Sequence, residues 1–203
     1  MANTVITISR GYGSGGRDVG VKLSETLGIE YYDKALIKIA SDESGIHEAL
    51  FGSNDEKIKN VLFKKGGAYK GYVFPPSSDD YVSDENLFSI QANVIKMLAK
   101  KESCIIIGRC ADYVLRDFEK VCRVFIYAPH DYCVSQIVER FAVDRKEAER
   151  LVEKVNRERG RYYKYYTGHN WTEATNYDLC IDISRCGLDN AVSLVQKYLH
   201  DNF

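Results

Sequence analysis

The sequence predicts an α/β fold in which a five-stranded parallel sheet carries helices on both faces. Short apolar or β-branched runs alternate along the chain with amphipathic segments of helical spacing. The run Cys104–Ile107 is continuously apolar, as expected of a strand that is buried on both sides. Such alternation favours parallel strands, because each connecting helix returns the chain to the same end of the sheet.

The length and charge of the chain limit its organisation and its partners. Its 203 residues carry 28 Lys and Arg against 29 Asp and Glu, a formal net charge of −1. A chain of this length forms one domain with a substantial core, so we expect a single domain over residues 1–203. The near-neutral balance argues against a protein that coats nucleic acid or an anionic membrane. The sequence does not indicate the oligomeric state.

Neither a membrane span nor a secretory leader is predicted. No apolar run approaches the roughly 20 residues of a membrane-spanning helix, and the first residues lack a basic segment followed by an apolar one. Six cysteines occur without a C-x-x-C pair, which predicts reduced and mostly buried thiols. We therefore expect a cytoplasmic protein.

In the N-terminal half, the elements follow from β-branched runs, helical spacing and end signals. A glycine is expected to end the first helix, and an aspartate to cap the second. The predicted elements are a strand at Val5–Ser9, a helix with Val19, Leu23 and Leu27 inside and Gly28 at its end, a strand at Glu30–Tyr32, and a helix with Asp33 as its cap and Leu36, Ile39 and Ala40 inside.

The C-terminal half repeats the pattern three times. Ser83 precedes a long amphipathic segment. The predicted elements are a helix bearing Leu87, Ile90, Val94 and Leu98, strands at Cys104–Ile107 and Val121–Tyr127, a helix bearing Val134, Ile137, Val138 and Phe141, a strand at Leu179–Ile183, and a final helix bearing Leu188, Ala191, Val192, Val195 and Leu199.

Two stretches do not follow this alternation of strands and helices and are interpreted as mobile covers of a ligand site. Residues 42–82 are rich in lysine and contain paired glycines and paired prolines; the residues concerned are Lys57, Lys59, Lys64, Lys65, Lys70, Gly66, Gly67, Pro75 and Pro76. Residues 142–178 begin as a charged helix whose pattern is expected to fail near Gly160. Both follow the C-terminal ends of strands or the next helix, where α/β sheets build binding sites.

The glycine cluster after the first strand is the most informative motif. It reads Gly11, Tyr12, Gly13, Ser14, Gly15, Gly16, Arg17, Asp18. Glycines permit positive φ angles and let backbone N–H groups approach an anion, and the following helix start adds free N–H groups and a positive dipole end. The segment therefore predicts a phosphate cradle.

Two nucleotide-binding patterns fit this loop. Gly11-x-Gly13-x-x-Gly16, with Asp33 after the second strand, matches a dinucleotide fingerprint. The same residues match a P-loop in which Arg17 stands for the usual lysine and Asp18 for the magnesium-binding hydroxyl. Both interpretations stay open on the loop alone.

An arginine-rich segment favours phosphoryl transfer, which needs cations around the charge of the moving group. Half of the chain's arginines lie between positions 140 and 161: Arg140, Arg145, Arg150, Arg157, Arg159 and Arg161. Interleaved glutamates explain Arg145 and Arg150 as a solvated helix face. The three arginines around Gly160 are better explained as a lid over phosphates.

Two more motifs complete a resemblance. Gly108-Arg109 follows the third strand, and Tyr177–Asp182 forms the strand before the final helix. With the glycine loop and the arginines, they make nearly the whole chain resemble nucleoside monophosphate kinases, above all the cytidylate kinase-like family. The resemblance implies a three-layer P-loop kinase fold, an acceptor-binding helical insertion at about 42–82 and an arginine-rich lid at about 142–178.

The resemblance also implies roles for residues. Gly11, Gly13, Ser14, Gly15, Gly16, Arg17 and Asp18 would bind ATP; Arg17, Arg157 and Arg161 would be catalytic; Asp33 and Arg109 would bind the acceptor; and Asp18 would hold Mg²⁺. Cys110 departs from the family's Gly-Arg-Asp motif, which leaves the preference for cytosine open, with Asp112 as a weak substitute.

The predicted function is an ATP- and Mg²⁺-dependent phosphotransferase with a small acceptor, for which a nucleotide is favoured. A nucleotide-binding regulator without transfer activity is the first alternative, because the Arg17-Asp18 pair is altered. An NAD(P)-dependent oxidoreductase is the second alternative. Tyr162, Tyr163, Tyr165 and Tyr166 are expected to pack in the core together with Trp171.

Overall fold

The computed structural model describes residues 3–51, 69 and 71–203. Within them, five parallel strands form one sheet in the order β2-β3-β1-β4-β5, which confirms the predicted sheet. The strands are β1 (Val5–Arg10), β2 (Glu30–Tyr32), β3 (Cys104–Ile107), β4 (Val121–Tyr127) and β5 (Leu179–Asp182).

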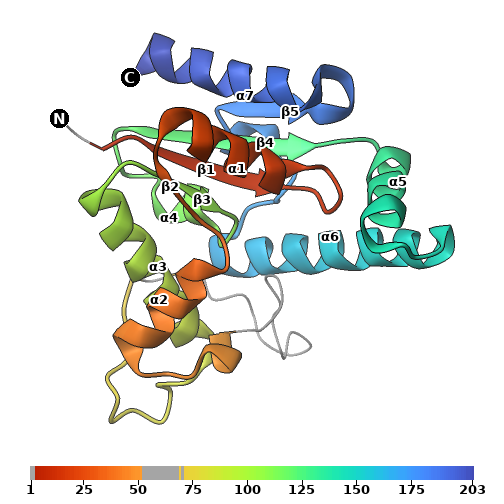
Figure 1. The fold of residues 1–203 in the computed structure, drawn as a ribbon. Coiled ribbons are helices and arrows are strands. Elements are labelled where there is room, and N and C mark those ends of the chain that lie inside the picture. The colour runs from red at the N-terminus through yellow and green to blue at the C-terminus, as the bar shows by residue number, and fades with distance from the viewer. Residues whose placement is uncertain (1–2, 52–68, 70) are drawn as a thin grey trace.

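Helices cover both faces of this sheet (Figure 1). The helices are α1 (Gly16–Leu27), α2 (Ala35–Ser44), α3 (Asp84–Lys101), α4 (Ala111–Val114), α5 (His130–Phe141), α6 (Arg145–Thr167) and α7 (Ile183–Asn202), with 3-10 turns at Glu48–Phe51 and Ala174–Asn176. On one face, α1 and α7 bury apolar side chains against β1, β3 and β4. On the other face, α3 and α6 pack against alternate residues of the same strands. This layering explains why β3 is apolar throughout.

The ends of several elements follow local signals. Gly28 ends α1 in the left-handed region with φ 66°, as predicted. The Ser83 hydroxyl caps α3 by accepting a hydrogen bond from the Asn86 N–H at 3.3 Å. The expected cap at Asp33 is wrong. Helix α2 starts one residue later, with Lys34 at the cap position and no side-chain cap bond, because the Asp33 carboxylate pairs with Arg17 instead.

The stretch 42–82 is described only in part. The residues Lys57, Lys59, Lys64, Lys65, Lys70, Gly66 and Gly67 lie outside the described residues. The segment that enters α3 is anchored by Asn86, whose amide accepts from the Phe74 N–H and donates to the Tyr81 carbonyl, both at 2.7 Å. The Tyr81 hydroxyl in turn donates to the Ser44 carbonyl at 2.6 Å, which joins this segment to the end of α2.

The stretch 142–178 contains a single long helix rather than a helix that stops near Gly160. Helix α6 runs unbroken through Gly160 to Thr167, so the expected failure of the helix there is wrong. A side chain at 160 would meet only the Trp171 ring at 4.0 Å, so the glycine leaves room and forces no bend. The four tyrosines of α6 are buried with Trp171 in one apolar cluster, as predicted.

The buried free cysteines agree with the sequence. Among the described residues, Cys104, Cys110, Cys122 and Cys133 are buried free thiols, whereas Cys180 is exposed. Burial raises the pKa of both Cys104 and Cys122 to about 12, so these thiols stay protonated. In the described part of the chain, no helix is both long and apolar enough to cross a membrane.

Candidate active site

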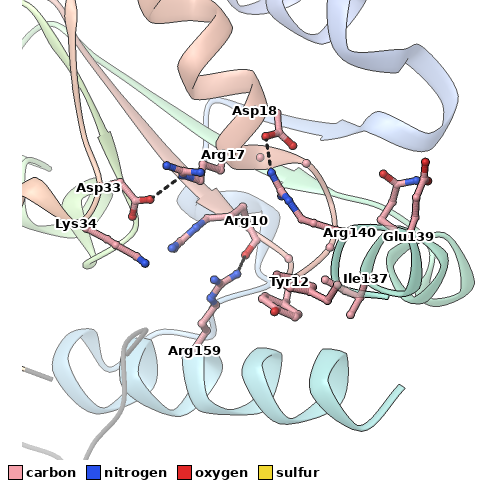
Figure 2. Close-up of a pocket in the computed structure, with 16 residues that line it drawn as sticks. Arg10, Tyr12, Arg17, Asp18, Asp33, Lys34, Ile137, Glu139, Arg140 and Arg159 are labelled. Carbon is pink, nitrogen blue, oxygen red and sulfur yellow. Dashed lines mark hydrogen bonds and ion pairs between the residues drawn. The ribbon is translucent and has the colours of Figure 1, made fainter. Parts of the chain in front are cut away.

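A cavity of about 650 Å³ opens at the C-terminal end of β1, beside the start of α1 (Figure 2). Its walls come from the glycine loop, the residues after β2, helix α5 and one residue of α6. The lining residues are Arg10, Gly11, Tyr12, Gly13, Gly15, Gly16, Arg17, Asp18, Asp33, Lys34, Gln136, Ile137, Glu139, Arg140, Phe141 and Arg159. The sequence-predicted loop and Asp33 thus share one cavity.

Gly13 is required because the loop passes close to the start of α5. Its φ is 80°, which disfavours other residues. A Cβ at this position would lie 2.5 Å from the Cys133 carbonyl oxygen, a backbone atom that cannot move aside cheaply. The glycine therefore sets how near the loop lies to α5, which forms the opposite wall of the cavity.

Gly16 is required for a different reason. It is the first residue of α1, and a Cβ there would overlap the Cβ of Arg10 and lie 3.2 Å from the Cβ of Ile126. The start of the helix therefore lies directly against the stem of the Arg10 side chain. Gly15, in the left-handed region with φ 78°, turns the chain into this helix start.

The rest of the loop is tied to the strands and to α6. The Gly11 N–H donates to the Ile126 carbonyl at 3.0 Å, and the Tyr12 N–H donates to Asn156 Oδ1 at 2.8 Å. The Ser14 side chain is fully buried, and its hydroxyl lies 2.9 Å from the Gly11 carbonyl oxygen and 3.1 Å from that of Ile126. In this arrangement the Ser14 hydroxyl fixes the loop and does not line the cavity.

Arg17 reaches from α1 towards the end of β2. Its Nε donates to Asp33 Oδ2 at 3.2 Å and its Nη2 to the Tyr31 hydroxyl at 3.3 Å. Tyr31 and then Asp33 raise the pKa of Arg17, so the guanidinium stays charged. The Arg17 side chain is 53% exposed, which leaves it free to exchange the carboxylate for another anion.

Asp18 holds a second arginine at the mouth of the cavity. Its Oδ1 accepts from Nη2 of Arg140 at 3.1 Å, and both side chains are about half exposed. The contact joins the first turn of α1 to the last turn of α5. A carboxylate in a first helical turn also stabilises the helix start, so Asp18 has a structural role beside any ligand role.

Two further arginines lie at the inner end of the cavity and are buried. Arg10, the last residue of β1, is 8% exposed, and Arg159 of α6 is 4% exposed. Nη1 of Arg159 donates to the Arg10 carbonyl at 2.9 Å, and its guanidinium carbon lies 5.7 Å from the centre of the Tyr12 ring. Our interpretation of the sequence grouped Arg159 with the lid and overlooked Arg10, Lys34 and the position of Arg140.

Helical periodicity separates the arginines of α6. Val152, Arg159 and Tyr166 lie seven residues apart on one face and are all buried. Arg157 and Arg161 lie two residues on either side of Arg159, are exposed, and do not line the cavity. Spacing along the helix was the sequence signal by which Arg159 could have been singled out.

Arg109 lies apart from the cavity, in a strained turn after β3. Gly108, Arg109 and Cys110 have φ angles of 71°, 57° and 54°, three consecutive left-handed residues. Arg109 is buried, and its Nη1 donates to Gln91 Oε1 of α3 at 3.4 Å. Asp112 accepts from the Tyr163 hydroxyl at 2.5 Å, so that carboxylate joins α4 to α6. Residues other than glycine that are held in the left-handed backbone conformation, as Arg109 and Cys110 are, are often associated with function.

The charges around the cavity favour a polyanionic ligand. Its lining includes five cationic side chains, from Arg10, Arg17, Lys34, Arg140 and Arg159, against three carboxylates, from Asp18, Asp33 and Glu139. The loop adds backbone N–H groups at the start of a helix. Phosphate groups match both features.

The strand order distinguishes the two nucleotide-binding patterns. In a dinucleotide-binding sheet, the second strand lies beside the first and brings its acidic residue to the ribose. Here β3 lies between β1 and β2, and the Asp33 carboxylate holds Arg17. The arrangement therefore fits a P-loop better than a dinucleotide fingerprint.

Solved structures share this fold. An uncharacterized protein from Eubacterium ventriosum is 26% identical, with a TM-score of 0.72 over 98% of this chain and 99% of that one. A shikimate kinase from Bacteroides thetaiotaomicron is 11% identical, with a TM-score of 0.54 over 97% and 98% of the two chains. A gluconokinase from Sinorhizobium meliloti is 13% identical, with a TM-score of 0.53 over 98% and 95%. The two kinases are similar in fold alone.

Comparison with models of protein families identifies a family for this chain. Among curated proteins, none matches the sequence. The family model described as the cytidylate kinase-like family matches residues 5–185, from the first strand to the start of the last helix. This match confirms the resemblance carried by the glycine loop and the element order, and the chain belongs to the cytidylate kinase-like family.

Proposed function

We propose that the protein is an ATP-dependent phosphotransferase that transfers the γ-phosphoryl group to a small acceptor, a nucleotide. The observation that carries the proposal is the glycine loop, which faces a cavity lined by five cationic side chains. The family and the kinase-like fold support phosphoryl transfer as the reaction type. The identity of the acceptor rests on the family alone.

In this proposal the loop binds the donor. The backbone N–H groups from Gly13 to Arg17 hold the β-phosphate, and Arg17 supplies the charge that lysine supplies in other P-loops. The exposed Arg17 releases Asp33 when it binds the phosphate, since the partners of an exposed ion pair exchange at small cost. Asp33 is then available to orient the acceptor. Arg109, which lies outside this cavity in the turn after β3, is proposed as the second acceptor-binding residue.

Catalysis would consist of positioning and charge neutralisation. An oxygen of the acceptor attacks the γ-phosphorus in line with the departing ADP, and the surrounding cations stabilise the charge on the transferred group. Arg17, Arg157 and Arg161 are the proposed catalytic cations. In the conformation described, Arg157 and Arg161 are exposed and do not line the cavity. Their contribution therefore requires either a movement of α6 or a ligand that reaches them.

Asp18 is the proposed holder of Mg²⁺. Its carboxylate lines the cavity two residues from the loop's last glycine and is half exposed, so it fits a hard cation that also binds phosphate oxygens. Within the described residues, no group of three or more His, Cys, Asp or Glu side chains gathers to hold a metal, so the ion would arrive with the nucleotide. When bound, it neutralises the charge of the β- and γ-phosphates. Asp18 must first release Arg140.

Nucleotide binding and turnover test the proposal. We expect binding of ATP but not of NAD, and formation of ADP with at least one member of a panel of nucleoside monophosphates. Tight ATP binding without turnover on any acceptor would instead support the regulatory alternative. Binding of NAD or NADP alone would contradict both.

A further inference from the structure

We propose that a second cavity, which we call the aromatic cavity, binds a nucleobase. The inference rests on the proposed function for the class of ligand. The aromatic cavity has a volume of about 720 Å³ and lies between β4, β5, α6 and the segment after α6. Gly11 lines both this cavity and the one beside the glycine loop, so the two are neighbours. The lining residues are Gly11, Phe125, Tyr127, Asn156, Gly160, Asn170, Trp171, Thr172, Ala174 and Cys180.

Three aromatic rings give the cavity faces on which a flat ring can stack. Phe125 and Trp171 meet edge to face, with ring centres 5.4 Å apart and planes at 86°. Tyr127 runs nearly parallel to Phe125, with centres 6.1 Å apart and planes at 17°, and it is 40% exposed. Stacking on aromatic side chains is a general way to hold a base, because every base has a π-face.

This aromatic wall is in place before any ligand binds. The Tyr177 hydroxyl donates to the Trp171 carbonyl at 2.7 Å and fixes the backbone that carries the indole. The Phe125 ring is stacked on Tyr177, with centres 5.0 Å apart, and both Phe125 and Trp171 are buried. A ligand that stacks here therefore pays little for ordering the side chains that it meets.

The wall that α6 contributes is polar and supplies hydrogen-bonding groups. Asn156 and Gly160 lie four residues apart on one face of α6, and both line the cavity. Oδ1 of Asn156 accepts from the Tyr12 N–H at 2.8 Å, which orients the amide, and its NH₂ group is a donor for a ring nitrogen or carbonyl. Asn170 adds a second amide to the lining. Aromatic faces combined with amides match a ring whose edge is polar.

Gly160 is the observation that helix formation and packing do not explain. Glycine is unfavourable in the interior of a helix, and α6 runs for 23 residues through this position. Among the described residues, a Cβ at 160 would meet only the Trp171 ring, at an ordinary 4.0 Å. Because Gly160 and Trp171 both line the cavity, a longer side chain would occupy the space beside the indole. The glycine keeps that space open at the expense of helix stability.

The test uses Trp171 as its reporter, because it is the single tryptophan of the chain. We would titrate the wild type with ATP, CMP, adenosine and cytidine, and with inorganic triphosphate, which has phosphates but no base. We expect at least one base-containing probe to quench the emission of Trp171, and triphosphate to quench it less. Calorimetry gives the affinities of the same probes.

Two variants close or weaken the cavity. Gly160→Leu should reduce the affinity for the quenching probe by at least about tenfold, and raise the melting temperature by about 2–4 °C because leucine favours a helix. Tyr127→Ala should reduce that affinity by about fivefold to fiftyfold, the loss expected when one stacking ring is removed. Both should leave the affinity for triphosphate within about twofold. Phe203→Ala removes an exposed aromatic ring outside the cavity and is the matched control.

The source of the base follows from competition. If ATP or CMP displaces the nucleoside, the base belongs to a nucleotide whose phosphates bind at the glycine loop. If the nucleoside and the nucleotide bind together, the cavity takes a separate nucleoside. Either result supports the inference.

The outcomes separate this inference from the proposed function. If no base-containing probe changes the emission of Trp171, or if Gly160→Leu and Tyr127→Ala leave every affinity within about twofold, the inference is overturned, and ADP formation still decides the proposed function. If the variants weaken binding as expected but no acceptor supports ADP formation, the inference stands and the proposed function fails. If Gly160→Leu lowers the melting temperature, Tyr127→Ala carries the comparison, since the exposed ring of Tyr127 leaves no buried void.

Discussion

Four arginines line the same cavity, but they form two different pairs. Arg10 and Arg159 are buried, come from β1 and α6, and are joined by a hydrogen bond to backbone. Arg17 and Arg140 are about half exposed, and each is paired with a carboxylate of the cavity, Asp33 or Asp18. The Arg159 side chain is anchored on the backbone of β1, whereas Arg17 and Arg140 must each release a carboxylate before they bind another anion. We infer that the inner end stabilises transfer and the outer end admits the nucleotide.

The largest effect is expected from the buried pair. Arg159→Met should lower the turnover of ATP by roughly a hundredfold to a thousandfold, the usual loss when one pre-positioned donor to a developing charge is removed. The measurement is steady-state ADP formation, with thermal unfolding to show that the variant folds. Turnover of Arg159→Met within threefold of wild type would contradict the inference that the buried arginines stabilise the transferred group.

A smaller effect is expected at the exposed pair. Arg17→Ala should weaken ATP binding by about tenfold and lower activity with it, because the lost contact is charged but exposed to solvent. The loss should shrink between about 0.01 M and 1 M salt, since screening acts on exposed charges. Titrating ATP at several salt concentrations checks this. A salt-independent loss would show that Arg17 acts as a buried group.

A third test concerns Asp18, the carboxylate partner of Arg140. Asp18→Asn keeps the shape of the side chain but removes the charge that would bind Mg²⁺, so half-maximal activity should require about fivefold to tenfold more free Mg²⁺. Asp131→Asn is the matched control, because Asp131 pairs with an exposed arginine, Arg145, and does not line the cavity. An unchanged Mg²⁺ requirement in Asp18→Asn would assign Asp18 to the helix start alone.

The smallest effect is expected on the outer face of α6. Combined replacement of Arg157 and Arg161 by Met should lower turnover by about threefold to fivefold, because the proposed catalytic contribution of these exposed arginines requires α6 or the ligand to approach them. Turnover equal to that of the wild type would contradict this contribution. Side-by-side kinetics with Arg159→Met give the comparison. A loss as large as that of Arg159→Met would mean that the helix moves on ligand binding and that these arginines are the lid that the family implies.

Most of the fold followed from local signals that tertiary structure did not override. The apolar run at Cys104–Ile107, the cap at Ser83 and the stop at Gly28 each specify their element without reference to distant residues. Asp33 failed as a cap because a partner elsewhere in the chain, Arg17, takes its carboxylate. Such a contact cannot be read from a spacing within the helix.

The site was predictable as a loop but not as a set of charges. The functional glycines can be recognised from the sequence, because the backbone requires glycine at these positions. Gly13 has a positive φ and lies close to the Cys133 carbonyl, and Gly16 lies close to the Arg10 side chain. Arg10 gives no such signal, since a cation at the end of a strand has no fixed spacing to the other residues that line the cavity. The arginines of α6 were grouped by proximity in sequence, whereas the helix places Arg159 on the face opposite Arg157 and Arg161.

The strand order has a consequence for how the chain folds. Among the described strands, β1 pairs with β3 and β4, and β2 pairs only with β3. Glu30 therefore lies opposite Cys104, and Val5 lies opposite Cys104 and Val121. The loop after β1 therefore cannot adopt its position until β3 and β4, the strands that pair with β1, have been added to the sheet. On a ribosome, the nascent N-terminal third would remain without its strand partners while later residues are made. Contacts so distant in sequence predict slow folding, with the loop assembled last.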